Sequence, residues 1–210
     1  MKITALTYET LTRFEKIIRP ENLTESQAER IEHLAYCANM GADSEETAWN
    51  RFADLVYREL NIDLKKEEAD RENREHCKHI AEELEAYAER TVYRCPECGE
   101  VISWEDSQYN DEEGTYTCQS CGEAFDESDL EALSVYDFIA DAYDVEYRIG
   151  SDMEYRSAKI MVACGGPNIY IDTARRLVTL HWWTDYAEYP ISSAAAEELD
   201  NVMEELYQCH

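Results

Sequence analysis

Four of the eight cysteines fall into two pairs that could hold a metal ion. Cys95 and Cys98 form one Cys-x-x-Cys pair, and Cys118 and Cys121 form the second pair after 19 intervening residues. Zinc takes four thiolates at the corners of a tetrahedron, and two thiolates separated by two residues fit on one tight turn. The spacing therefore predicts one bound zinc ion. Its role should be structural, because four protein ligands leave no open position for a water molecule.

A glycine follows each cysteine pair, at Gly99 and Gly122, where the backbone must turn so that its N–H groups point toward sulfur. With these glycines, residues 91–128 resemble the zinc-ribbon class of small metal modules. That resemblance implies a fold and leaves the function open. The alternative is a pair of redox-active Cys-x-x-Cys motifs, which ribbon spacing makes the weaker interpretation.

Further histidines and cysteines lie on predicted helices. His33 and Cys37 are four residues apart on one helix, and His76, Cys77 and His79 lie on another. A second metal site is one interpretation of this group. Part-buried cysteines beside solvated histidines are the other, and the incomplete ligand set favours it.

Two segments carry residues that could take part in catalysis. The glycine pair in 165–168 could suggest a phosphate-binding loop, but it lies between two predicted strands and no helix N-terminus follows it. His181 could act as a general base, yet no nucleophile or orienting acid accompanies it, so a half-buried strand histidine is expected. We therefore assign no catalytic residue and expect a protein that is not an enzyme.

The strongest global feature is acidity. Asp and Glu total 47 against 19 Lys and Arg, for a formal net charge of −28. Residues 91–128 hold ten acids and one base, Arg94. Such a field repels nucleic acid and anionic membranes and attracts a basic protein. Solubility alone is the simpler explanation of the acidity.

The hairpin between the two cysteine pairs is the expected partner-binding surface. Its acids are Glu105, Asp106, Asp111, Glu112 and Glu113. Fifteen tyrosines and four tryptophans offer a second kind of contact, because aromatic residues suit protein interfaces as well as cores.

Helical signals dominate residues 1–90. A capping box at 24–27 precedes Ala28, Ile31, Leu34, Ala35 and Ala38 at helical spacing, and Gly41 ends that helix. A second helix opens at 43–46, with a buried stripe expected at Trp49, Phe52, Ala53, Val56 and Leu60. A third is predicted from about Asp63 to Arg90. Its first half, 65–75, is polar all round and should project into solvent. Its second half carries a stripe at Cys77, Ile80, Ala81, Leu84, Tyr87 and Ala88.

The pattern changes after the cysteine module. Residues 129–143 predict a short linking helix, with Leu130, Leu133 and Ala140 along it. Alternation then predicts four strands, around 145–149, 158–164, 169–171 and 177–183. Ser192 or Ser193 caps a last helix that faces the sheet through Ala195, Leu199, Val202 and Leu206. The predicted fold class is α+β: a helical domain over 1–90, an inserted zinc ribbon over 91–128, and over 129–210 the linking helix plus a small antiparallel sheet with one covering helix.

The sequence predicts neither secretion nor a membrane span. Residues 1–11 lack an apolar core of a signal peptide, and no run approaches 18 apolar residues. Paired cysteines without a signal favour a reducing cytosol.

The segment 160–173, followed by Trp182, Trp183 and 186–188, resembles a C-terminal module of small acidic proteins of phages and mobile elements in gut bacteria. The resemblance covers the last 65 residues. It implies a counter-defence role like that of anti-CRISPR and anti-restriction proteins, in the cytosol of a bacterial host. The function expected from it is an acidic DNA mimic that inhibits an RNA-guided nuclease or, second, a restriction enzyme. The alternative is a zinc-ribbon adaptor in a transcription or repair assembly.

Overall fold

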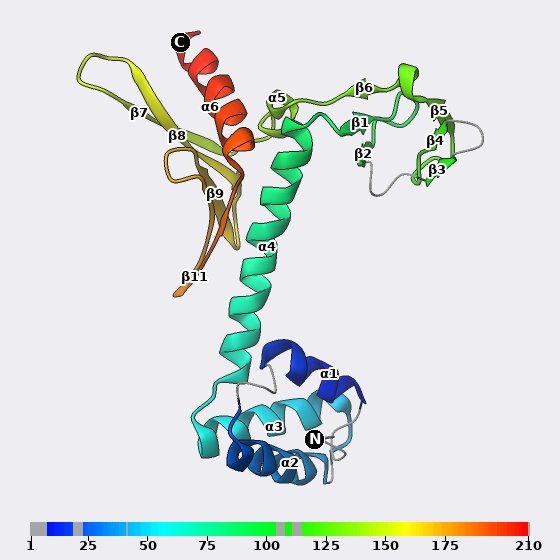
Figure 1. Cartoon of the computed structure of the whole chain (residues 1–210), viewed down its shortest axis with the longest axis vertical. Helices are drawn as coiled ribbons and strands as arrows, with labels where there is room; N and C mark the ends of the chain where they lie inside the picture. The colour runs from blue at the N-terminus through cyan, green and yellow to red at the C-terminus, as the bar shows by residue number, and fades with distance from the viewer. Residues whose placement is uncertain (1–7, 19–22, 41, 104–107, 111–114, 210) are drawn as a thin grey trace. The chain divides into compact units, whose positions relative to one another are not determined.

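The structure is a computed structural model that describes residues 8–18, 23–40, 42–103, 108–110 and 115–209 (Figure 1). The chain forms two compact units, residues 1–72 and residues 73–210. The first unit is helical, and the second combines the cysteine module with a five-stranded antiparallel sheet and a C-terminal helix. The predicted α+β class is confirmed.

Unit 1 is built from the helices α1, α2 and α3 and the start of α4, with bounds Tyr8–Ile17, Glu25–Asn39, Glu45–Leu60 and Leu64–Ala88. The expected capping box is present, because the Thr24 hydroxyl accepts from the Gln27 N–H while the Gln27 side chain accepts from the Thr24 N–H. Ser44 caps α3 through one bond, because its hydroxyl accepts from the Thr47 N–H. Helix α2 ends at Asn39, and the expected stop at Gly41 lies outside the described residues.

The core of unit 1 is an aromatic cluster wrapped by aliphatic side chains. The Phe52 ring is 5.6 Å from that of Phe14 and 6.0 Å from that of Trp49, between ring centroids. The buried members of this core are Phe14, Ile31, Leu34, Ala35, Ala38, Trp49, Phe52, Ala53, Val56 and Leu64. The predicted stripes of α2 and α3 are therefore confirmed, except that Ala28 and Leu60 are only partly buried.

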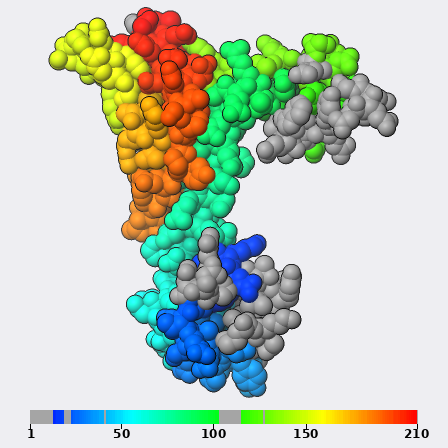
Figure 2. Space-filling view, viewed as in Figure 1, coloured from blue at the N-terminus to red at the C-terminus, as the bar shows by residue number. Residues whose placement is uncertain are grey.

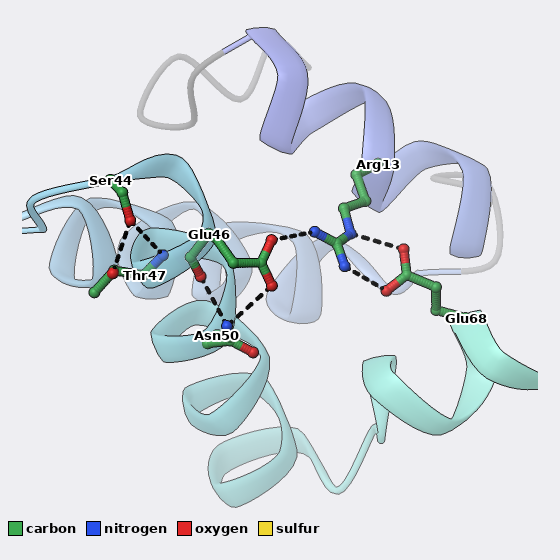
Figure 3. Close-up of polar contacts among 6 residues, drawn as sticks. All are labelled: Arg13, Ser44, Glu46, Thr47, Asn50 and Glu68. Atoms are coloured by element: carbon green, nitrogen blue, oxygen red, sulfur yellow. Dashed lines mark hydrogen bonds and ion pairs between the residues drawn. The ribbon is translucent and has the colours of Figure 1, made fainter.

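One guanidinium ties three helices of unit 1 together (Figure 3). Arg13 of α1 donates two hydrogen bonds of 2.7 and 2.8 Å to Glu68 of α4 and one of 3.0 Å to Glu46 of α3. Its guanidinium carbon also lies 4.4 Å from the centre of the Trp49 ring. The side chain of Glu68 is 13% exposed, so the expectation that 65–75 projects into solvent is wrong at this position. No local pattern predicts this contact, because Arg13 lies 55 positions before Glu68.

Unit 2 contains a sheet with strand order β11-β10-β9-β8-β7, all antiparallel. Its strands run over Asp144–Ile149 (β7), Tyr155–Ala163 (β8), Asn168–Asp172 (β9), Leu177–Trp182 (β10) and Asp185–Pro190 (β11). The four predicted strands are present. The fifth, β11, was not predicted and pairs with β10 along its whole length.

Two helices cover one face of this sheet. The second half of α4 contributes Cys77, Ala81 and Leu84, and α6, Ser193–Gln208, contributes Ala195, Ala196, Leu199, Val202 and Met203. Both sets pack against inward-facing strand residues such as Ile160, Ile171 and Leu180. Figure 2 shows α6, in red, lying against the strands. The predicted inner faces of α4 and α6 are confirmed, and Ser192 is the residue that caps α6.

The linking helix predicted over 129–143 is wrong for most of its length. The segment begins with a 3-10 turn at Glu127–Asp129, continues as β6, Glu131–Ala132, and becomes helical only in α5, Val135–Phe138. The reason is a competing backbone partner, since β6 pairs with a strand of the cysteine module and the Leu133 N–H donates to the Val92 carbonyl. No helix within the described ranges is long and apolar enough to cross a bilayer.

Candidate metal centre

The four cysteines sit on two hairpins of matching construction. Strands β1, Val92–Arg94, and β2, Val101–Ser103, form the first hairpin, and β4, Thr115–Thr117, and β5, Ala124–Asp126, form the second. A short strand β3, Gln108–Asn110, pairs with β4. Each cysteine pair occupies the turn of one hairpin, so both pairs are held by strand pairing on either side.

Each turn is closed by the same two backbone hydrogen bonds. The Cys95 N–H donates to the Glu100 carbonyl at 2.8 Å, and the Gly99 N–H donates to the Cys95 carbonyl at 2.9 Å. In the second turn Cys118 and Gly122 repeat both bonds, to Glu123 and to Cys118. The two glycines have φ of +75° and +79°, with open space where a Cβ would lie. Glycine is therefore needed here for its left-handed backbone and not for room.

The two turns bring all four sulfurs together. The Cys95 and Cys121 sulfurs are 3.7 Å apart, as are the Cys98 and Cys118 sulfurs, and all four lie within 4.8 Å of one another. A disulfide would need about 2.05 Å. Tetrahedral corners about 2.3 Å from a zinc ion lie about 3.8 Å apart. The predicted ligands thus form one cluster whose spacing fits four sulfurs around a single metal ion.

The cluster is half enclosed. Cys95 and Cys118 are buried at 1% exposure, whereas Cys98 and Cys121 are exposed. Beneath the buried pair lies a small apolar core that adds only Ile102 and the partly buried Phe125. Among the described residues this core is far smaller than the cores of unit 1 and of the five-stranded sheet, so we expect the hairpins to depend on the sulfur cluster for their association.

Backbone donors and crowding set the acidity of the thiols. The N–H groups of Cys121 and Ser120 lower the pKa of Cys118 to about 7, against the opposing effect of desolvation. At Cys98 the N–H of Glu100 acts to lower the pKa, but desolvation and the three neighbouring cysteines outweigh it and raise the pKa to about 12. Four thiols this close cannot all ionise by themselves. A bound divalent cation removes the conflict, because it stabilises every thiolate at once.

The other candidate ligands and bases do not assemble into a centre among the described residues. Among the described residues, the four cysteines are the one group of three or more potential ligands that converges. His33 lies 3.8 Å from the Cys37 sulfur, and Cys77 is buried in the core of unit 2. His181 is exposed between Tyr170 and Tyr186, so the expectation of a half-buried histidine is wrong.

The acids expected to bind a partner are outside the described residues. They are Glu105, Asp106, Asp111, Glu112 and Glu113. Within the described part of the module, the acidic side chains of Glu97, Glu100, Glu123 and Asp126 are exposed. Arg94, the one base of the module, donates a 3.3 Å hydrogen bond to the Gly99 carbonyl.

No family model, no curated protein and no solved structure matches this chain. The resemblance of the last 65 residues to a phage-encoded module therefore stays a prediction.

Thiol reactivity tests the cluster directly. We expect three cysteines, Cys37, Cys164 and Cys209, to react rapidly with Ellman's reagent in metal-loaded protein, because they are exposed and outside the cluster. A chelator should release the four cluster thiols. Cys77 should react only after denaturation, because burial raises its pKa to about 11 and leaves its side chain 0% exposed. Seven rapidly reacting thiols without a chelator would contradict a metal-bound cluster.

Proposed function

We propose that this chain is a non-enzymatic inhibitor that binds a basic, nucleic-acid-handling defence enzyme and blocks its access to DNA. An RNA-guided nuclease is the first proposed target and a restriction enzyme the second. The setting is the cytosol of a bacterial host. Zinc is the proposed occupant of the four-cysteine cluster, where it holds the two hairpins in one rigid arrangement.

The distribution of charge supports this proposal. Residues 73–210 carry 31 of the 47 acids but only nine of the 19 bases. Several of those bases are already engaged, since Arg148 pairs with Asp172 and Arg156 with Asp152 and Glu154. Helix α6 has five acids and no base. Unit 2 therefore presents mainly carboxylates to a partner.

Carboxylates in this number suit a surface that normally binds phosphates. Duplex DNA carries one charge per ~1.7 Å of its axis, and its binding channels are lined by Lys and Arg. A folded array of carboxylates can occupy such a channel with little loss of conformational entropy on binding. In the cysteine module the bound metal supplies that rigidity. It is needed there because the apolar core of the two short hairpins is small among the described residues.

The test is cleavage of target DNA by a guide-loaded RNA-guided nuclease, and then by a restriction enzyme, with this chain in excess. We expect inhibition that competes with DNA and weakens steeply with added salt, because the attraction is screened. The exposed acids Glu97 and Glu123 provide the test substitution. Reversing both to Lys should slow association more than it speeds dissociation.

A matched control has the same net charge. Reversing the exposed Glu15 and Glu29 of unit 1 changes the charge by the same amount, away from the cysteine module. Equal effects of the two double variants would show that net charge alone matters. Absence of inhibition with both enzymes would reject the proposal and favour the adaptor function. Inhibition that is insensitive to salt would remove the DNA-mimic mechanism.

A further inference from the structure

Each turn of the cysteine cluster carries one buried sulfur and one exposed sulfur. Cys95 and Cys118, the first cysteines of the two turns, are 1% exposed, whereas the second cysteines, Cys98 and Cys121, are exposed. A structural metal site needs four thiolates, but it does not need any of them at the surface. The exposure of one sulfur in each turn therefore points to a second property of the cluster.

The exposed sulfurs are open to a small reagent. Gly99 and Gly122 follow them directly, and apart from chain neighbours no atom of the described residues lies within 4 Å of the position that a Cβ would take there. The side chains of Glu100 and Glu123, the next residues along, are exposed as well. An accessible thiolate reacts with small oxidants, and a neutral one such as hydrogen peroxide is not repelled by the acidic surface.

Each exposed sulfur has a neighbour in the opposite turn. The Cys98 sulfur lies 3.7 Å from that of Cys118, and the Cys121 sulfur lies 3.7 Å from that of Cys95. Both contacts join a surface cysteine of one hairpin to a buried cysteine of the other. A surface thiol that becomes oxidised beside a second thiol that can resolve it is the usual arrangement of a redox-sensitive site.

The pattern of disulfides determines whether the hairpins stay associated after oxidation. Bonds within the turns, from Cys95 to Cys98 and from Cys118 to Cys121, would leave the hairpins unconnected. Bonds along the two 3.7 Å contacts would connect the hairpins twice. Because their apolar core is small among the described residues, we expect only the second pattern to preserve their association without a metal ion.

We propose that the cysteine cluster is an oxidation site for hydroperoxides, at which the four metal-binding thiolates become the two disulfides Cys98–Cys118 and Cys95–Cys121 and the metal ion is released. The identity of the ion as zinc rests on the proposed function, whereas the pairing of the sulfurs rests on their positions alone. The hairpins keep their arrangement, because two covalent bonds between them replace the ion.

Atoms and electrons balance in this exchange. At each pair the exposed thiolate attacks one peroxide oxygen, the O–O bond breaks, and a sulfenic acid and a hydroxide ion form. The buried thiolate then attacks the sulfenic sulfur, the S–O bond breaks, and a disulfide and a second hydroxide ion form. Each peroxide accepts two electrons from one pair of sulfurs, and the zinc ion leaves with its charge unchanged.

The experiment treats the zinc-loaded chain with hydrogen peroxide and follows zinc release with a colorimetric indicator. The chain carries Cys37→Ser, Cys164→Ser and Cys209→Ser, because these exposed cysteines lie outside the cluster and would form bonds between chains. We expect the loss of one zinc ion per chain and an intact mass lower by four hydrogen atoms than that of the reduced, metal-free chain. Added thiol reductant and zinc should reverse both changes.

Digestion after glutamate under non-reducing conditions identifies the pairing. Cleavage after Glu97 separates Cys95 from Cys98, further glutamates separate the two turns, and no glutamate lies between the cysteines of the second turn. Disulfides between the turns should hold three peptides together in one species, whereas disulfides within the turns would give two species. Partial reduction and alkylation before digestion then identifies which sulfur of one turn is bonded to which sulfur of the other.

Amide exchange measures the fate of the hairpins. In the disulfide-bonded chain, residues 92–103 and 115–126 should stay as protected as they are with zinc. The matched control is the reduced chain treated with a chelator, which lacks both the ion and the disulfides and should lose this protection. The comparison thus separates loss of the metal ion from loss of the hairpin arrangement.

Three results would overturn the oxidation site. They are disulfides within the turns, loss of hairpin protection in the disulfide-bonded chain, and zinc that stays bound at a peroxide dose that fully oxidises the exposed Cys164 of the unchanged chain. A chain that binds no zinc rejects only the occupant given under the proposed function, because digestion of the peroxide-treated chain still tests the pairing. Absence of nuclease inhibition likewise rejects the proposed function and leaves the oxidation site standing.

Discussion

Replacing Cys118 with Ser should cost the chain its metal ion and unfold the two cysteine hairpins, while the helical unit and the five-stranded sheet remain folded. A structural zinc site contributes about 10–16 kcal/mol in small zinc-binding peptides, and that binding energy is folding energy. Among the described residues of the hairpins, the apolar core adds only Ile102 and Phe125 to the buried cysteines, and Tyr116 packs beside Tyr93. The helical unit and the sheet have separate cores, so they should stay folded when the hairpins unfold.

Native mass spectrometry and amide exchange measure the two parts of this result. We expect one zinc ion per chain in the unchanged protein and none in Cys118→Ser, with exchange rising over 92–103 and 115–126 only. The control is Cys164→Ser, which removes an exposed cysteine outside the cluster and should keep the metal. A variant that retains one zinc ion, or hairpins that stay protected without it, would contradict a structural role for the metal.

The metal ligands could be predicted from the sequence because the necessary geometry is local. Each cysteine pair and its following glycine lie within one turn, so spacing alone brings two sulfurs together. The association of the two turns was predicted by analogy with known zinc modules. What spacing could not supply is the environment of each sulfur, since the burial of Cys95 and Cys118 depends on Ile102 and Phe125 from the adjoining strands.

The helix predictions were right where the helix ends carry capping residues. They were wrong where a residue far away in the sequence takes the backbone hydrogen bonds of the segment. Thr24 and Ser44 each bond to a backbone N–H within the first turn of the helix they cap, so the local sequence identifies the starts of α2 and α3. The spacing of Leu130 and Leu133 suggested a helix, yet the Leu133 N–H is taken by Val92, 41 positions earlier. Periodicity records which faces are apolar and says nothing about which strand lies beside the segment.

The fifth strand could have been found from the sequence. Tyr186, Ala187, Glu188 and Tyr189 alternate between the two faces, and Ala187 is buried while Glu188 is exposed. The two adjacent tryptophans, Trp182 and Trp183, interrupt the alternation of apolar and polar residues. The turn between β10 and β11 therefore could not be recognised from the sequence pattern.

A carboxylate on the inner side of α6 shows the limit of sequence reasoning most clearly. Asp200 accepts a hydrogen bond of 2.5 Å from the Tyr155 hydroxyl and one of 2.6 Å from the Thr173 hydroxyl. The Thr173 oxygen also accepts from the Ala158 N–H at 3.0 Å, so the chain of bonds joins α6 to the β8–β9 hairpin. Burial, followed by the bond to Asp200, raises the pKa of Tyr155. Partners 27 and 45 positions away leave no local pattern to detect.

Replacing Asp200 with Ala should destabilise unit 2 by about 2–4 kcal/mol, because the Tyr155 and Thr173 hydroxyls both lose their acceptor and Thr173 is buried. Denaturant unfolding, followed by the tertiary signal of the sheet, measures this change. Glu197→Ala removes an exposed acid from the same helix and should alter the free energy of unfolding by less than about 0.5 kcal/mol. Asp200→Asn keeps one acceptor oxygen, so its loss of stability should fall between those of Asp200→Ala and Glu197→Ala.

A double-mutant cycle tests the bond to Tyr155. The stability losses of Asp200→Ala and Tyr155→Phe should couple by about 1 kcal/mol or more. Additive losses would mean that Asp200 acts through helix packing, and the hydrogen bond to Tyr155 would then contribute nothing measurable.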